Sequence, residues 1–315
     1  MAQIKIQERL KIETLLDAGH NATAIALQLG RNRATISKEI KRNSVDGKYC
    51  HALAQKQTDK RRANAKSGIL TDDNWTTVRA LLQQKWSPEQ ISGWLKEHPE
   101  MGFYVSDQWI YEYIYSDRAQ GGELYKHLRR AGKPYKNGGK KQYRGKIKDR
   151  IDISARPDII NKRQRLGDWE VDSVIGQMNQ SSIVTIVERV SRYTAIIKVN
   201  SKEAEQVCES IVERMATSSL PLYSMTGDNG TEFSQHKKIA QELGIDFYFT
   251  HPYSSWEKGT NENTNGLIRQ YFPKGTDFSK ITASMLSDVE AALNTRPRKC
   301  LNYKTPNEIL GVRSK

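Results

Sequence analysis

The sequence predicts a multidomain protein in which all-α helix-turn-helix modules precede an α/β domain, a mixed five-stranded sheet with flanking helices. Two patterns of short amphipathic helices occupy the first part of the chain, and a basic segment broken by glycine and proline follows them. After about residue 165, β-branched runs alternate with helical runs. We therefore divide the chain into residues 1–64, 65–125, 126–164 and 165–315.

The composition points to a polyanionic partner. The 315 residues include 50 Lys+Arg against 36 Asp+Glu, which gives a formal net charge of +14. Neutralising phosphates releases condensed counterions, so this excess favours nucleic acid, although a merely basic soluble protein has the same composition. The three cysteines are far apart and form no CxxC pair, which suits a reducing compartment. The sequence shows no signal peptide and no membrane span, so we expect a cytoplasmic protein.

Residues 1–64 contain the first helix-turn-helix pattern. Asn21 is placed to cap a short helix, Gly30 makes a tight turn, and "RATISKEIKRN" forms a second helix with Ile36 and Ile40 inward. This second helix would enter the major groove of DNA. A plain helical hairpin is the alternative. The predicted DNA-contacting side chains are Arg31, Arg33, Thr35, Ser37, Lys38, Lys41 and Arg42.

The next two segments carry weaker signals. In residues 65–125, Ser87 and Ser106 are placed as N-caps of two helices that resemble a second helix-turn-helix, but a small packing domain fits equally well. Residues 126–164 read as a basic linker that follows the DNA backbone, or else as a solubilising tether. Its predicted contacts are Lys140, Lys141 and Arg144, with Tyr135 and Tyr143 placed for stacking.

Five strands are expected in the last domain. They lie in "DWEVDSVIG", residues 182–187, residues 193–199, "LYSMTGDNG" and "IDFYFTHPY". Amphipathic helices separate the last three, and a further helix follows the fifth. This order is typical of a mixed sheet covered by helices.

Three carboxylates occupy positions suited to metal-dependent chemistry. Asp172 lies in the first strand, and Asp228 ends the fourth, where open sheets place active sites. Glu262 lies in "TNENTNGLIRQYF", which is polar enough for a loop but has an apolar back at about 100° per residue. A capping box with Ser254 as N-cap and Glu257 at N3 is expected upstream. We therefore predict a helix that presents Glu262.

Such a set suits phosphodiester cleavage and transfer by two Mg²⁺ ions held about 4 Å apart by oxygen ligands. Lys258, Asn265 and Arg269 share the predicted helical face of Glu262. They are placed to contact the DNA backbone beside the metals. Any single carboxylate taken alone is more simply a solvated charge.

Three motifs, "WEVD", "TGDNGTEF" and "KGTNENTNGLIRQYFPKGTDF", resemble the signatures of DDE transposases with an RNase H-like core, and most closely the bacterial "insertion sequence thirty" family. The resemblance covers most of the chain. It implies that Asp172, Asp228 and Glu262 bind two Mg²⁺ ions, for which Mn²⁺ can substitute. It also implies that the N-terminal region binds the terminal inverted repeats of the element, and that a homodimer acts on double-stranded terminal and target DNA in the bacterial nucleoid.

One choice within the triad stays open from the pattern alone. Asp168, Glu170 and Asp172 alternate onto one face of the first strand, so the pattern also fits Glu170. We choose Asp172 because retroviral integrases, which share the core, carry their first aspartate three residues after a tryptophan. The His-His-Cys-Cys zinc module of those integrases has no counterpart here, and we expect no zinc.

The functional prediction is a transposase that cleaves DNA at inverted-repeat ends and joins the freed 3′-hydroxyl to another strand. A helix-turn-helix regulator explains the N-terminal half and the charge, but leaves the three carboxylates without a role. A structure-selective nuclease on the same core would cleave without joining. Tyrosine or serine recombination would leave the metal-type triad unused.

Overall fold

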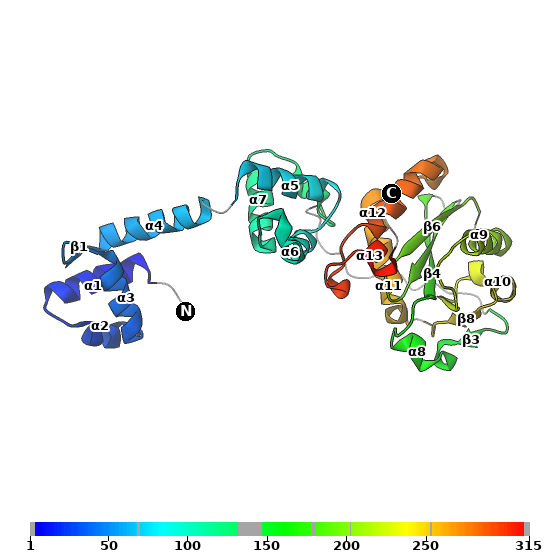
Figure 1. The fold of residues 1–315 in the computed structure, drawn as a ribbon, viewed down its shortest axis with the longest axis horizontal. Coiled ribbons are helices and arrows are strands. Elements are labelled where there is room, and N and C mark those ends of the chain that lie inside the picture. Colours follow the sequence, from blue (N-terminus) through cyan, green and yellow to red (C-terminus); the bar gives the residue numbers. More distant parts are fainter. Residues whose placement is uncertain are drawn as a thin grey trace. The chain divides into compact units, whose positions relative to one another are not determined.

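The structure, a computed structural model, describes residues 4–67, 70–131, 147–177, 181–201, 203–252 and 254–311 (Figure 1). The chain forms two compact units, Met1–Trp75 and Thr76–Lys315. The linker residues predicted to contact DNA, Lys140, Lys141 and Arg144, lie outside the described residues, as do Tyr135 and Tyr143.

The N-terminal unit contains the predicted helix-turn-helix. The Asn21 side chain accepts hydrogen bonds from the amides of Thr23 and Ala24, and Gly30, at φ 60°, ends the first helix of the pair. Ile12, Ile25 and Ile36 are fully buried and join the helices. The helices are α1 (Ile6–Asp17), α2 (Ala22–Leu29), α3 (Arg33–Asn43) and α4 (His51–Ser67).

A small hairpin in this unit was not predicted. Strands β1 (Ser44–Val45) and β2 (Lys48–Tyr49) pair antiparallel between α3 and α4. Asp46 and Gly47 connect them at φ 49° and 76°. An Asp-Gly pair with two positive φ angles is the preferred two-residue hairpin turn, so the sequence carried a signal that the helical reading overlooked.

The second helical module consists of the three helices that follow α4 in the chain. Ser87 forms the predicted capping box with Gln90, each side chain bonding the other's backbone amide at 3.2 and 2.9 Å. The module packs on the segment after α12, where the Gln90 amide donates to the Pro297 carbonyl at 2.7 Å and Gly93 lies against the Tyr303 ring. Its helices are α5 (Asp72–Gln83), α6 (Pro88–Glu97) and α7 (Asp107–Ala119).

A mixed sheet of six strands forms the centre of the larger unit, in the order β3-β8-β7-β4-β5-β6. The predicted count of five was wrong by one, because the two-residue strand β3 pairs parallel with β8 and is too short to show a strand pattern. β4, β7 and β8 are parallel neighbours, whereas β5 is antiparallel to β4 and β6. The strands are β3 (Ile151–Asp152), β4 (Asp168–Ile175), β5 (Ser182–Glu188), β6 (Thr194–Val199), β7 (Ser224–Gly227) and β8 (Asp246–Phe249).

Helices cover both faces of this sheet (Figure 1). Odd-numbered residues of β4, including Trp169 and Val171, pack in one core with α9 and α10. Val174, from the other face, packs in a second core with α11 and α12. Alternation along β4 therefore sends Asp168, Glu170 and Asp172 to the α11 side. The helices are α8 (Asp158–Asn161), α9 (Ala204–Ala216), α10 (His236–Leu243), α11 (Gly259–Tyr271), α12 (Ala283–Asn294) and α13 (Pro306–Leu310).

A buried carboxylate organises the turn between β5 and β6. Glu188, 1% exposed, accepts hydrogen bonds from the amides of Gly167 at 3.1 Å and Val190 at 2.9 Å. Its second oxygen also accepts from the amide and hydroxyl of Ser191. These bonds satisfy backbone donors that the short turn would otherwise leave unpaired in the interior.

We predict that Glu188→Gln lowers the free energy of unfolding by about 2–3 kcal/mol, because an amide group replaces one charged acceptor and faces the same donors. A urea titration of the full chain, followed by circular dichroism, measures the change. Glu213→Gln, on the exposed side of α9, is the control and should stay within about 0.5 kcal/mol of wild type. Equal midpoints for the two variants would show that the turn does not depend on the carboxylate.

Candidate active site

Two of the predicted carboxylates lie on neighbouring parallel strands. The register pairs Asp168 with Ser224 and Glu170 with Thr226, and continuing it by two residues places Asp172 beside Asp228. Asp228 directly follows the last residue of β7, and its Oδ1 accepts a hydrogen bond from the Gly230 amide at 3.1 Å. Both side chains are partly exposed. The sheet thus presents two carboxylates side by side at the carboxyl end of β7.

The third predicted carboxylate, Glu262, lies in α11, and residues near it in the chain contact Asp172. The Lys258 ammonium donates to Asp172 Oδ1 and to the Val171 carbonyl, both at 3.1 Å. The Asn265 amide donates to Asp172 Oδ2 at 2.7 Å. Glu262 is exposed, lies in the first turn of α11, and precedes Asn265 by three residues, so the two side chains share one side of the helix.

The predicted helix is confirmed, but its predicted capping box is wrong. A 3₁₀ turn, Ser255–Lys258, precedes α11, and the Ser254 side chain makes no capping hydrogen bond. Glu257 instead accepts from the His251 amide at 2.8 Å and bonds its Nδ1 at 2.6 Å. His251 follows β8 and lies six residues before Glu257, and its donors take the place of the Ser254 amide.

The three acidic residues that alternate along β4 differ in burial and in their partners. Glu170 and Asp168 are 1% exposed, whereas the Asp172 side chain is 22% exposed. Arg189 donates to Glu170 Oε1, and Arg165 bonds Asp168 at 2.9 and 3.0 Å. Burial raises the pKa of Glu170, and the Arg189 guanidinium opposes this shift. Glu170 and Asp168 are therefore members of buried polar pairs.

The side chains predicted to contact DNA beside Glu262 have other partners. Lys258 is buried, and Asn265 also accepts from the Thr185 hydroxyl at 3.1 Å, so both polar groups are occupied in holding Asp172. Arg269 donates to the Ile175 carbonyl at 2.7 Å and lies over the Phe278 ring. Desolvation lowers the pKa of Arg269. The sequence prediction grouped all three residues on one helical face but did not identify these contacts.

The predicted recognition helix α3 exposes four basic side chains, Arg33, Lys38, Lys41 and Arg42, while Thr35 and Ser37 are half-buried. Arg31 precedes the helix and forms an ion pair with Glu8 of α1 at 2.9 Å. This pairing lowers the pKa of Glu8. Arg31 is thus tied to the domain core, whereas the exposed set faces solvent.

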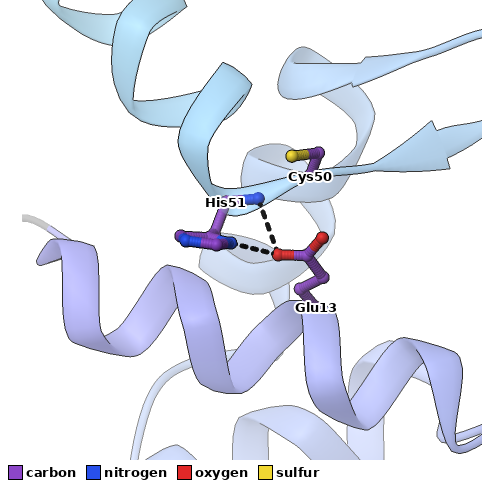
Figure 2. A group of neighbouring side chains, drawn as sticks. All are labelled: Glu13, Cys50 and His51. Atoms are coloured by element: carbon purple, nitrogen blue, oxygen red, sulfur yellow. Dashed lines mark hydrogen bonds and ion pairs between the residues drawn. The ribbon is translucent and has the colours of Figure 1, made fainter.

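A cluster of possible cation ligands lies in the N-terminal unit (Figure 2). One ligand atom from each of Glu13, Cys50 and His51 lies within 4.8 Å of the others. Glu13 accepts from the His51 amide at 3.0 Å and bonds its Nδ1, which satisfies a donor at the start of α4. The backbone hydrogen bond lowers the pKa of Glu13. The cluster is accounted for as a helix cap, and the expectation of no zinc stays a prediction.

Within the part of the chain that the structure describes, no helix has the length and apolar character to cross a membrane.

Comparison with known proteins finds related domains and relatives along most of the chain. A helix-turn-helix domain family model matches residues 2–43, and an integrase core domain model matches residues 162–255. The transposase for insertion sequence element IS4351 of Bacteroides fragilis is 42% identical over 96% of this chain and 93% of its own length. Transposase InsI for insertion sequence element IS30A of Escherichia coli (strain K12) is 37% identical over 98% and 84%.

Among solved structures, the catalytic core domain of BIV integrase is 23% identical and covers 45% of this chain and 91% of its own. The TM-score of this match is 0.35. The two family models confirm the predicted fold class, helix-turn-helix followed by an integrase-type α/β core, apart from the strand count.

We predict a pH-dependent contribution of His251 to stability. Hydrogen bonding to Glu257 raises its pKa above the usual 6.5, with help from Asp152 and opposed by burial and Arg150. The stabilisation is therefore complete below about pH 6.5 and disappears as pH rises through the higher folded-state pKa. Melting curves should show a larger gap between wild type and His251→Gln at about pH 6 than at about pH 9.

His20→Gln removes an exposed histidine of the N-terminal unit and is the matched control. A gap for His251→Gln that stays constant across this pH range would contradict the assigned ion pairs.

Proposed function

This chain belongs to the IS30 family of insertion-sequence transposases, and we propose that it cleaves DNA at the terminal inverted repeats of its element and joins the freed ends to target DNA. The family resemblance predicted from the three motifs is confirmed. The integrase core implies a polynucleotidyl transferase that uses divalent metal ions. The finer proposal concerns which residues act and how.

One observation carries the assignment of Asp172, Asp228 and Glu262. Two come from neighbouring parallel strands in matching register, and the third lies between two residues whose side chains bond Asp172. These contacts support a common site for the three carboxylates at one edge of the sheet. The buried alternative, Glu170, has Arg189 as its partner and has little access to solvent.

The donor chemistry fits Mg²⁺. All three groups are carboxylates, the hard oxygen ligands this ion prefers, and all three have solvent access. When bound, two such ions supply activation of the attacking water or 3′-hydroxyl and stabilisation of the leaving oxygen. We propose that Asp172 and Asp228 hold them with Glu262, with Mn²⁺ as a substitute.

The chain's own side chains position this set. Lys258 bonds one oxygen of Asp172 and Asn265 the other, which fixes the carboxylate plane and leaves the remaining lone pairs for a ligand. The Lys258 ammonium also offsets the repulsion among the three carboxylates. Thr185 fixes the Asn265 amide in turn, through a contact from the neighbouring strand β5.

DNA binding by the N-terminal unit is the other half of the proposal. The exposed Arg33, Lys38, Lys41 and Arg42 on α3 support contact with the major groove of the terminal repeats. Two ends must be paired for strand transfer, so we propose a homodimer as the active form. With double-stranded DNA as its substrate, the protein would act in the cytoplasm at the nucleoid.

We predict that Asp228→Asn and Glu262→Gln each abolish cleavage and strand transfer, because each removes an anionic metal ligand, while binding of terminal DNA stays near wild type. Labelled terminal DNA incubated with Mg²⁺, and in parallel with EDTA, measures both steps. Glu242→Gln, exposed on α10, is the control and should remain active. Strand transfer that survives in the Asp228 and Glu262 variants would reject the assignment.

A second prediction separates Asp172 from Glu170. Asp172→Asn should abolish strand transfer, and because it leaves the buried Lys258 ammonium without its partner charge it should also lower the free energy of unfolding. Glu170→Gln leaves Arg189 buried without its partner charge and should cost about 3–5 kcal/mol of unfolding free energy. The folded fraction of Glu170→Gln should still carry out strand transfer at low temperature. The reverse pattern would move the metal ligand to Glu170.

A further inference from the structure

A second polar site lies on the other side of α11. Thr260 and Asn263 line a cavity of about 220 Å³, and both point roughly opposite to Asn265 around the helix. The cavity is therefore separate from the edge that holds Asp172. Glu262 lies between the two faces, directly before Asn263. A strand of DNA that reaches Glu262 would therefore pass close to this cavity.

Three arginines from distant segments line the cavity: Arg163 after α8, Arg192 in the β5–β6 turn, and Arg298 after α12. The Thr260 hydroxyl oxygen accepts from Arg163 at 3.1 Å and from Arg192 at 2.9 Å. Both of these arginines have positive φ angles, 53° and 64°, which non-glycine residues rarely adopt. Two positively charged guanidinium groups thus donate to the same uncharged hydroxyl oxygen.

Among the described residues these charges form no contact ion pair, and the buried Glu170 carboxylate attracts Arg163 only over a longer distance. None of the three guanidinium groups lies within 4.0 Å of a carboxylate of those residues, and no Asp or Glu lines the cavity. Arg298 is 6% exposed, and its Nε has no hydrogen-bond partner among the described residues. Burial, and then the charge of Arg296, lowers the pKa of Arg298 to about 10.

Collecting like charges without an anion is unfavourable, and more so when one of them is buried. An anion in the cavity removes both costs. Arginine forks match the oxygens of a phosphate, with two parallel N–H donors each. The volume is below the roughly 300 Å³ of a small-molecule pocket, which suits one phosphate group better than a whole nucleotide or cofactor.

We propose that the Arg163–Arg192–Arg298 cavity binds one backbone phosphate of the DNA strand that enters the active site. This rests on the proposed function, because that function makes DNA the phosphate source. The site would fix the strand relative to Glu262 through a phosphate other than the one cleaved. Arg129, which donates to Asn263 at 2.9 and 3.3 Å, adds a further positive charge beside Glu262.

Salt dependence of DNA binding tests the proposal without any cleavage. The full chain is titrated, without metal, against a fluorescent duplex of unrelated sequence at several salt concentrations. The double variant Arg163→Gln/Arg192→Gln should lower the magnitude of the slope of log K against log[salt] by about 0.9, the value for one phosphate. At about 0.1 M salt this corresponds to binding about eight-fold weaker.

Lys237→Gln/Lys238→Gln is the matched control, because it removes two charges on α10, on the opposite face of the sheet, each paired with a carboxylate. Its slope should equal that of wild type. Arg163→Lys/Arg192→Lys should restore most of the slope with weaker affinity, since lysine keeps the charge but not the fork. This restoration distinguishes a lost phosphate contact from a misfolded variant.

A second arm identifies the source of the phosphate. Inorganic phosphate is compared with chloride at equal ionic strength in thermal melts of wild type and of the arginine-to-glutamine double variant. If the double variant has the same slope of log K against log[salt] as wild type, the proposal is overturned. This holds even if phosphate raises the wild-type Tm, because the cavity would then bind free phosphate and not a DNA phosphate. Neither result tests the assignment of Asp228 and Glu262 as metal ligands, because an error in that assignment would appear only in the cleavage and strand-transfer assay.

Discussion

The candidate active site depends on the hydrogen bonds that Lys258, just before α11, and Asn265, within α11, donate to the Asp172 carboxylate. Lys258 and Asn265 reach it from the start and the second turn of one helical segment, and both oxygens of Asp172 are engaged. An apolar contact could bring α11 to the sheet, but it would leave the helix free to rotate. Two polar contacts on opposite oxygens fix the rotation, and with it the position of Glu262. The apolar back of the helix, Leu267 and Ile268, supplies the burial.

Other buried carboxylates of the larger unit also have cationic or hydrogen-bonding partners. Asp168 and Glu170 are buried beside Arg165 and Arg189, and Glu188 is surrounded by backbone donors. Each is compensated by a partner, as buried ionised groups must be. The arginines of the cavity beside α11 differ, because the described residues offer them hydroxyl and carbonyl oxygens but no carboxylate. A protein that binds a polyanion can leave arginines without a contacting carboxylate until the ligand binds.

Much of this arrangement was predictable from the chain. The caps at Asn21, Ser87 and Ser106, the buried stripe of α9 and the helix that carries Glu262 depend on neighbours within a few residues, and such local patterns are present in sequence. The failures also have physical causes. Strand β3 is too short for a period-two pattern, and the turn after β8 gives Glu257 the His251 amide, six residues earlier, in place of the expected Ser254 amide.

The sequence by itself determined the family, the order of the main elements and the candidates Asp228 and Glu262, because motifs and periodicity are properties of nearby residues. It could not distinguish Asp172 from Glu170, since both lie on the same face of one strand. Tertiary structure placed Arg189 against Glu170, and Lys258 with Asn265 against Asp172. Burial and partner choice depend on residues far apart in the chain. For the same reason, only the fold could show that three scattered arginines line one cavity.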